Sequence, residues 1–300
     1  MILAVWRMRT VSMASIEKTN KNLYKNGRPF SETLVRGLGE QVGRIDYGKA
    51  SLVIVDGGVG NGKTTLGVHI ADYIQGSEID LDNQLAVGGN DFVKKLYQGT
   101  KKDYKVVIYD ESGDFDRRGA ISRFNRMLNR IFDTYRTFQI VIILILPSFK
   151  VLENDIFDKK IPRILLNTHN KTSNYASFRA YSLYRMYLLK NRMQKLNVPP
   201  QAYNLITPNF RGHFKDLSPE RSKKLDKISS QAKQDILEEY NLIEDGLLSY
   251  KDMARELSKS VIWVKQKVSE LRLKHEKTLR NTKYFNEEVL KTLEGEVQRR

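Results

Sequence analysis

The 300 residues include no cysteine, so disulfide bonds, thiolate catalysis and cysteine-based zinc sites are excluded. Histidine is scarce as well, and its positions do not have the spacing of metal ligands. The four histidines are His69, His169, His213 and His275. A metal site built from side chains alone is therefore not expected. A chain without disulfides is typical of an intracellular protein, so we expect a cytoplasmic location.

Long hydrophobic runs are also missing. The longest one, residues 138–147 (FQIVIILILP), is about half of the roughly 20 residues that a membrane-spanning helix needs. Its β-branched residues favour a buried strand of a parallel sheet. The opening segment carries Arg7 and Arg9 after its short apolar stretch, the reverse of a secretory signal. No association with a membrane is expected.

The charge of the chain is strongly of one sign: 51 basic residues against 35 acidic ones give a net charge of +16. This balance favours a polyanionic partner, usually nucleic acid, although a basic protein without such a partner can have the same composition. Within residues 177–189, Arg179 and Arg185 alternate with aromatic residues. This pattern could grip a nucleic acid strand, but we favour a two-faced sheet edge.

The chain divides by pattern into four regions. Residues 1–30 form a basic, aperiodic arm, residues 31–215 alternate strands with helices, residues 216–235 are a charged connector, and residues 236–300 are helical. The alternation predicts an α/β domain whose mainly parallel sheet has helices on both faces. Strands are expected at 51–56, within 78–87, and at 105–109, 139–146, 161–167 and 177–189, and helices at 63–74, 91–97 and 120–135.

A phosphate-binding loop is predicted at residues 57–64, where GGVGNGKT matches the pattern G-x-x-x-x-G-K-[ST] without a mismatch. Glycines let successive N–H groups turn toward phosphate oxygens, and the start of the following helix adds partial positive charge. Lys63 is expected to reach the β and γ phosphates, and Thr64 to ligate Mg²⁺. The predicted nucleotide-binding residues are Gly57, Gly58, Val59, Gly60, Asn61, Gly62, Lys63, Thr64 and Thr65.

Asp110 and Glu111 end the next clear apolar strand, within the sequence KVVIYDES. Ligands of open α/β sheets bind at the carboxyl ends of the strands. Asp110 is therefore predicted to hold Mg²⁺, and Glu111 to act as the general base toward water. Ser148 follows the strand at 139–146, where it is either a sensor of the γ-phosphate or an ordinary turn residue. The predicted cofactors are ATP and Mg²⁺, and the predicted activity is a Mg²⁺-dependent ATPase.

The segments GGVGNGKTT, VVIYDESGDFDRRG and QIVIILILPS, within residues 45–190, carry a family resemblance. They resemble P-loop ATPases of the additional-strand, catalytic-glutamate division, most of all the HerA/FtsK group with its zonula occludens toxin-like members. That group has a polar Gln or Thr-Gln after the last strand, where this chain has Pro147 and Ser148. The resemblance implies a RecA-like domain, a ring-forming ATPase acting on double-stranded DNA, and an arginine supplied by the neighbouring subunit. Arg117 and Arg118 are candidates, although each also suits a solvated charged surface.

Residues 249–274 are expected to form two short helices joined by a tight turn at 258–260, with a preceding helix at 236–243. This pattern predicts a small all-α domain that resembles simple or winged helix-turn-helix domains. The turn lacks the glycine that is often found there, and a protein-docking helical bundle is the alternative. The predicted DNA contacts are Lys265, Lys267, Arg272 and Lys274.

These features favour an ATP-driven motor that translocates, packages or processes double-stranded DNA and associates with itself as a ring or filament. Two other classes of function fit the same residues. One is an ATPase switch that loads a helicase or regulates transposition. The other is an assembly factor whose binding to a protein partner is gated by nucleotide.

Overall fold

A computed structural model describes residues 30, 32–47, 51–110, 125–131, 139–169, 171–172, 175–196, 203–244, 246–279 and 282–298. The chain divides into two compact units, residues 1–226 and 227–300. All but the last residue of the predicted N-terminal arm lies outside this description. Among the described residues, no helix has both the length and the apolar character needed to span a membrane.

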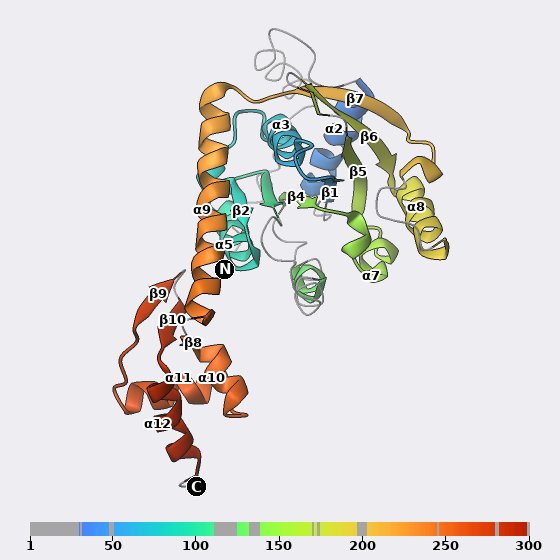
Figure 1. The fold of residues 1–300 in the computed structure, drawn as a ribbon. Coiled ribbons are helices and arrows are strands. Elements are labelled where there is room, and N and C mark those ends of the chain that lie inside the picture. Colours follow the sequence, from blue (N-terminus) through green and yellow to red (C-terminus); the bar gives the residue numbers. More distant parts are fainter. Residues whose placement is uncertain are drawn as a thin grey trace, which may run out of the picture. The chain divides into compact units, whose positions relative to one another are not determined.

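The first unit is built on a seven-stranded sheet with the order β2-β3-β4-β1-β5-β6-β7 (Figure 1). The first five strands in this order are parallel, and the last two are antiparallel to their neighbours. The strands are β1 Ser51–Gly57, β2 Leu85–Val87, β3 Val106–Asp110, β4 Val141–Leu146, β5 Pro162–His169, β6 Tyr175–Ser182 and β7 Phe210–Lys215. The predicted α/β unit with a mainly parallel sheet is confirmed, and its architecture is consistent with a RecA-like P-loop fold.

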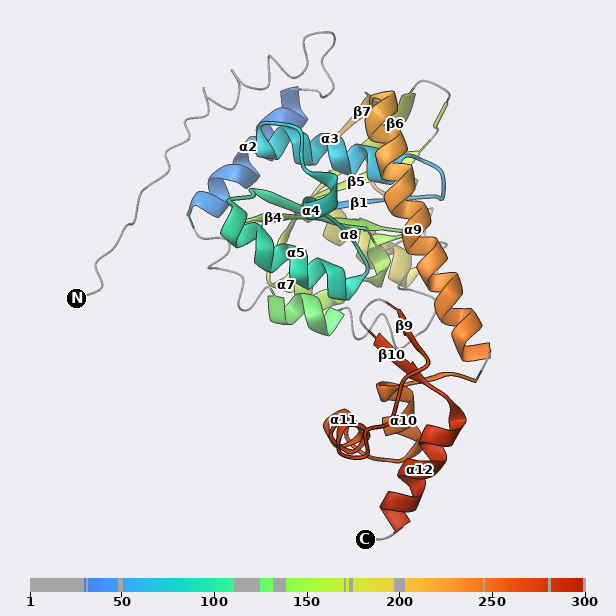
Figure 2. The ribbon, with the colours of Figure 1, turned by 90° about the vertical axis from the view of Figure 1, so that its left-hand side faces the viewer.

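Helices cover both faces of this sheet (Figure 2). On one face, Gly67 of α3 packs against Ile143 and Ile145 of β4. On the other face, Ile142 and Leu144 join a core cluster with side chains of α5 and α8. The helices are α2 Glu32–Asp46, α3 Lys63–Gln75, α4 Leu81–Gln84, α5 Gly89–Lys102, α7 Asn154–Asp158, α8 Leu183–Lys195 and the 3₁₀ turns η2 Phe149–Val151 and η3 Tyr203–Leu205.

The three central strands β1, β3 and β4 are buried at every position, which explains their apolar sequences. Strand β4 is inserted between β1 and β3. Because all three are parallel, their carboxyl ends meet at one edge of the sheet. Gly57, Asp110 and the residues just after Leu146 therefore gather at that edge.

One expectation for the first unit is wrong, and one of its strands lacks a sequence signal. The strand predicted at 177–189 ends at Ser182, and helix α8 follows because Met186, Leu189 and Met193 have helical spacing and are buried. Strand β7 was not predicted at all. It lies at the edge of the sheet, where Arg211 and His213 are exposed, so its sequence lacks an apolar run.

The region predicted as a connector is largely helical, because α9 runs continuously from Pro219 to Glu244. In the first unit, Arg221 of α9 makes a two-pronged ion pair with the buried Asp72 of α3. The division between the two units falls inside this helix. The helix expected at 236–243 is also part of α9, but its side chains at Ile236, Tyr240 and Ile243 lie outside the described ones.

The second unit was predicted to be all-α. This prediction is wrong, because the unit contains a three-stranded antiparallel sheet of order β8-β10-β9. These strands are two to four residues long, too short for a periodic pattern to reveal them. The elements are β8 Leu248–Ser249, α10 Tyr250–Glu256, α11 Val261–Glu270, β9 Lys277–Leu279, β10 Thr282–Phe285 and α12 Glu287–Gln298.

The turn between α10 and α11 has a left-handed backbone, which glycine usually supplies. Here Ser258 adopts it, with φ of 52°. The N–H of Lys259 then donates to the carbonyl oxygen of Ala254 at 2.9 Å and closes the end of α10. Met253, Val264 and Phe285 share one core, so the two short helices pack together with the hairpin.

Candidate functional site: the glycine-rich loop and Asp110

The loop between β1 and α3 needs glycine at particular positions. Gly57, Gly60 and Gly62 have φ of 141°, 78° and 74°. A Cβ atom on Gly57 would lie 2.4 Å from the carbonyl oxygen of Thr168, and one on Gly62 would lie 3.2 Å from the ring of Phe214. The loop is thus held by both its backbone conformation and close packing against β5 and β7.

Lys63, the first residue of α3, folds back over the loop. Its Nζ donates to the carbonyl oxygens of Gly57 and Gly58, both at 3.0 Å. Gly62 has no side chain to cap the helix, so an anion can take the place of a cap at the N-terminus of α3. Both features fit the binding of phosphate at this loop.

Thr64 and Asp110 are brought together from α3 and β3. The Thr64 hydroxyl donates to Oδ2 of Asp110 at 2.7 Å. Adjacent ligands of octahedral Mg²⁺ lie about 3 Å apart, since each lies about 2.1 Å from the ion. The two oxygens therefore have the chemistry and spacing of neighbouring Mg²⁺ ligands. Within the described residues, no group of three or more His, Asp or Glu side chains could hold a metal ion. Mg²⁺ in proteins is usually bound by one or two side chains, with water and phosphate oxygens as its other ligands.

Asp56 at the end of β1 was not singled out from the sequence, although it ends an apolar strand as Asp110 does. Its side chain is fully buried and accepts hydrogen bonds from the Phe149 N–H at 2.9 Å, from Asn167 Nδ2 at 3.1 Å and from the Tyr203 hydroxyl. Burial raises the pKa of Asp56 to about 6, while these hydrogen bonds and the charge of Lys63 act in the opposite direction.

Ser148, the predicted sensor, is the N-cap residue of η2 just beyond β4 and is buried. Its hydroxyl accepts a hydrogen bond from the Lys150 N–H at 3.3 Å. It also shares a side-chain hydrogen bond with Tyr203, which in turn bonds to Asp56. Ser148 therefore belongs to a polar network at the base of the loop, and its role toward nucleotide stays a prediction.

Several predicted functional residues lie outside the described ones. These are Glu111 and the candidate arginines Arg117 and Arg118. Asp110, which immediately precedes Glu111, ends β3 with its side chain almost fully buried. The roles assigned to Glu111 and the two arginines stay predictions.

The four predicted DNA contacts occupy two different settings in the second unit. Lys265 and Lys267 lie on α11, while Arg272 and Lys274 come after its end. Lys267 forms ion pairs with Glu270 at 2.7 Å and Glu296 at 3.5 Å, and the hydrogen bond with Glu270 raises its pKa. Lys265 Nζ lies 5.7 Å from the ring centroid of Tyr250. Lys267 is thus the predicted contact most engaged with its own unit.

Arg179 of β6 lies between Asn167 of β5 and Arg211 of β7 in the sheet register. Its Nε atom is buried and has no hydrogen-bond partner among the described residues. Arg211 is exposed on the edge strand. Arg179 and Arg211 are thus direct neighbours in the register of β6 and β7.

No protein-family model matches the chain, and no curated protein matches it. The solved structures to which the chain shows a partial likeness include the following three. The N-terminal domain of zonular occludens toxin from Neisseria meningitidis is 12% identical, with 45% of this chain and 84% of that one covered and a TM-score of 0.27. A HORMA:CdnC:Trip13 complex from E. coli MS115-1 is 16% identical, with 62% and 73% covered and a TM-score of 0.34.

The third structure is the VirB11 ATPase from the Brucella suis type IV secretion system, in complex with sulphate. It is 12% identical, with 64% of this chain and 67% of that chain covered and a TM-score of 0.26. All three TM-scores lie below 0.5.

Proposed function

We propose that this chain is a Mg²⁺-dependent ATPase. The observation that carries the proposal is the 2.7 Å hydrogen bond between Thr64 and Asp110 beside a loop of the P-loop pattern. Two residues 46 positions apart in the sequence meet where one Mg²⁺ ion can bind both. A turn rich in glycine with no function would not need a carboxylate at this place.

Each residue of the site has a definite task in this proposal. The amides of the loop and of the α3 N-terminus bind phosphate oxygens. Lys63 Nζ leaves the carbonyl oxygens of Gly57 and Gly58 and donates to phosphate oxygens instead. Thr64 and Asp110 hold the metal ion, which stabilises charge on the phosphates. Glu111 takes a proton from the attacking water as general base.

The test is Mg²⁺-dependent release of phosphate from ATP by the wild-type chain and by Lys63→Ala. The variant is expected to lose about 10²-fold or more in turnover, because the loop loses its charged side chain. A matched control is Lys159→Ala, which removes a lysine from an exposed ion pair with Asp155. Near-native turnover by Lys63→Ala, with thermal unfolding unchanged, would overturn the assignment of the site.

We further propose that the ATPase acts as a motor on double-stranded DNA. The net charge of +16 supports a polyanionic partner. The second unit supports DNA as that partner. Its elements follow the order of a winged helix-turn-helix, which is a short strand, two helices joined by a tight turn, and a hairpin. In such domains the second helix, here α11, enters the major groove. The resemblance to the HerA/FtsK group supports self-association into a ring.

The motor proposal is tested by mass measurement with and without a non-hydrolysable ATP analogue and duplex DNA. A ring predicts a larger assembly when both are present, and a motor predicts ATPase turnover that rises with duplex DNA. A chain that stays monomeric under all conditions, with turnover insensitive to DNA, would contradict the motor. The ATPase proposal would survive that result, because it is tested by Lys63→Ala alone.

A further inference from the structure

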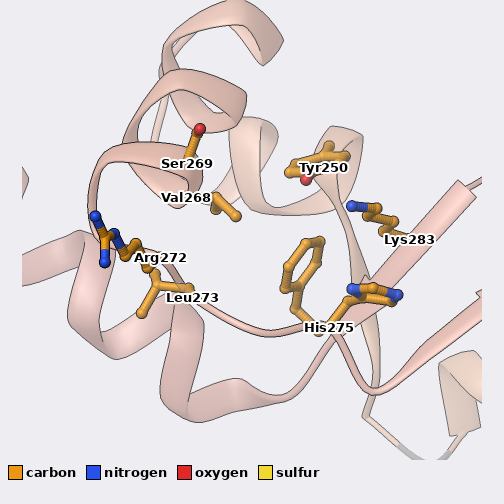
Figure 3. A pocket seen from close by; sticks show the side chains of 8 residues that line it. Tyr250, Val268, Ser269, Arg272, Leu273, His275 and Lys283 are labelled. Carbon is orange, nitrogen blue, oxygen red and sulfur yellow. The ribbon is translucent and has the colours of Figure 1, made fainter.

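The second unit contains a pocket of about 290 Å³ beside the end of α11 and the β9–β10 hairpin (Figure 3). Its apolar lining comes from Val268 of α11, Leu273 just beyond that helix and Phe285 of β10, together with the ring of Tyr250. Its polar lining comes from Ser269, Arg272, His275 and Lys283. Nothing in the proposed ATPase cycle uses this pocket.

The apolar part of the pocket is largely aromatic. The ring centroids of Tyr250 and Phe285 are 4.9 Å apart at an interplanar angle of 57°, and the His275 ring lies 6.3 Å from that of Phe285. Phe285 is fully buried and fixes the position of Tyr250, which is partly exposed. A flat, weakly polar group can therefore lie against a rigid aromatic surface.

The polar part is basic and contains no carboxylate. Figure 3 shows Arg272 on one side of the pocket and His275 with Lys283 on the other. Arg272 is held there by a left-handed backbone, with φ of 53°, and by a hydrogen bond from its N–H to the Ser269 carbonyl oxygen at 3.2 Å. In the described part of the chain, none of these three side chains has an ion-pair partner, whereas nearby Lys267 has two. The rim is thus suited to an anion.

We propose that this pocket binds one unpaired nucleotide of a DNA strand. The base lies against Tyr250 and the apolar lining, and the phosphate lies against Arg272 and Lys283. A volume of about 290 Å³ is at the lower end for ligand pockets, which suits one nucleotide and not a stacked duplex. A paired base would have to leave its stack to enter. The pocket therefore selects strand ends or single-stranded segments, and this inference rests on the proposed binding of DNA.

The experiment uses the full chain and three labelled DNAs: a blunt duplex, the same duplex with a short single-stranded overhang, and the same overhang made of abasic nucleotides. The natural overhang is expected to bind about tenfold more tightly than the blunt duplex, since one stacked base contributes that much. The abasic overhang should lose most of this gain. His275→Ala combined with Lys283→Ala should abolish the preference for the overhang, while Lys291→Ala, which removes an exposed lysine of α12, should keep it.

Equal affinity of the wild-type chain for blunt and overhang DNA would overturn the proposal that this pocket binds an unpaired nucleotide. An undiminished preference for the overhang in the double variant would overturn it as well. In either case binding to duplex DNA would remain, so the proposed function would stand. Failure to bind any of the three DNAs would overturn both the proposed action on DNA and this inference.

Discussion

Tyr203 donates a hydrogen bond to the buried carboxylate of Asp56, from 147 residues further along the chain. Asp56 lies at the end of β1, directly before the glycine-rich loop, and Tyr203 begins η3 after helix α8. A carboxylate buried this completely requires several donors, and the structure supplies three. The base of the loop is therefore tied to a segment that the linear sequence places far from it.

Asp56→Asn is expected to change how stability depends on pH. The pKa of Asp56 rises from 3.8 to about 6 on folding. The stability that the protonated side chain contributes is therefore fully present below pH 3.8 and is lost as pH rises through about 6. The cost of ionising it when buried is about 3 kcal/mol, because one pKa unit corresponds to about 1.4 kcal/mol. As pH rises from about 4 to about 7, the free energy of unfolding of the Asn variant, measured in urea, should increase by up to about 3 kcal/mol relative to that of wild type.

Tyr203→Phe is the matching variant with the opposite expectation. Removing the donated hydrogen bond raises the pKa of Asp56 further, because that bond lowers it in the wild type. The loss of stability with rising pH should then extend to higher pH and become larger in total than in wild type. The assignment fails if Asp56→Asn and wild type keep a constant difference in unfolding free energy across this pH range.

The loop, Asp110 and the central strands could be predicted from the sequence because each is a local pattern. SLVIVD before GGVGNGKTT indicates both the strand and the phosphate-binding loop after it, and FQIVIILILP has the composition of a buried parallel strand. Asp56 carried the same signal as Asp110 but has no place in the P-loop pattern. Its partners Asn167 and Tyr203 depend on strand order and chain path, which no window of sequence contains.

The hairpin of the second unit shows a different limit. Strands β9 and β10 have three and four residues, and their sequences KTL and TKYF mix lysine with apolar side chains. Period-two alternation cannot be seen over so few positions. Phe285 is nevertheless buried, because the hairpin packs on α10 and α11, and Tyr284 is buried as well. The two helices could be predicted, but the sheet beside them could not.

Thr64→Val is expected to raise the Mg²⁺ concentration needed for ATP hydrolysis and to lower turnover by roughly 10- to 100-fold. The variant keeps the size of the side chain but removes the hydroxyl that donates to Asp110 at 2.7 Å. Thr64→Ser restores a hydroxyl at the same place and should recover most of the turnover. Titrating Mg²⁺ in a phosphate-release assay distinguishes a metal ligand from a merely structural threonine, whose replacement would leave the Mg²⁺ dependence unchanged.

Glu111→Gln should keep nucleotide affinity while slowing hydrolysis by about 10² or more, the usual contribution of a positioned base. Asp110→Asn is the informative comparison, because it should weaken the binding of Mg²⁺ with ATP instead. Fluorescent nucleotide binding and phosphate release measure the two effects separately. Normal hydrolysis by Glu111→Gln would mean that another residue activates the water.

Arg221→Ala is expected to destabilise the first unit by roughly 3 kcal/mol, because removing one partner of a largely buried ion pair leaves the charge of Asp72 only partly compensated. The Arg221 guanidinium makes two hydrogen bonds with Asp72, whose Oδ1 also accepts from the Ile79 N–H at 2.9 Å. Lys224→Ala is the control, since its ion pair with Asp82 at 2.6 Å is exposed and worth about 0–1 kcal/mol. Equal losses in the two variants, measured by urea unfolding, would contradict this distinction.

A chain ending after Asp226 should retain basal ATPase activity but bind duplex DNA more weakly. The division between the compact units falls there, and the described nucleotide-site residues Gly57, Lys63, Thr64 and Asp110 all belong to the first unit, which also keeps the ion pair of Arg221 with Asp72. For every DNA phosphate that only the second unit neutralises, the truncation should reduce the slope of log affinity against log salt by about 0.9.

The single variants Lys265→Ala and Lys267→Ala refine this measurement. Lys267 is bound to Glu270 and Glu296, so its replacement should change the salt slope less than replacement of Lys265. Weakening that is uniform across DNA sequences indicates phosphate contacts, whereas loss of sequence preference indicates contacts with bases. If the truncated chain keeps full affinity and the same slope, duplex DNA contacts the first unit, where Arg179 and Arg211 lie side by side in the sheet.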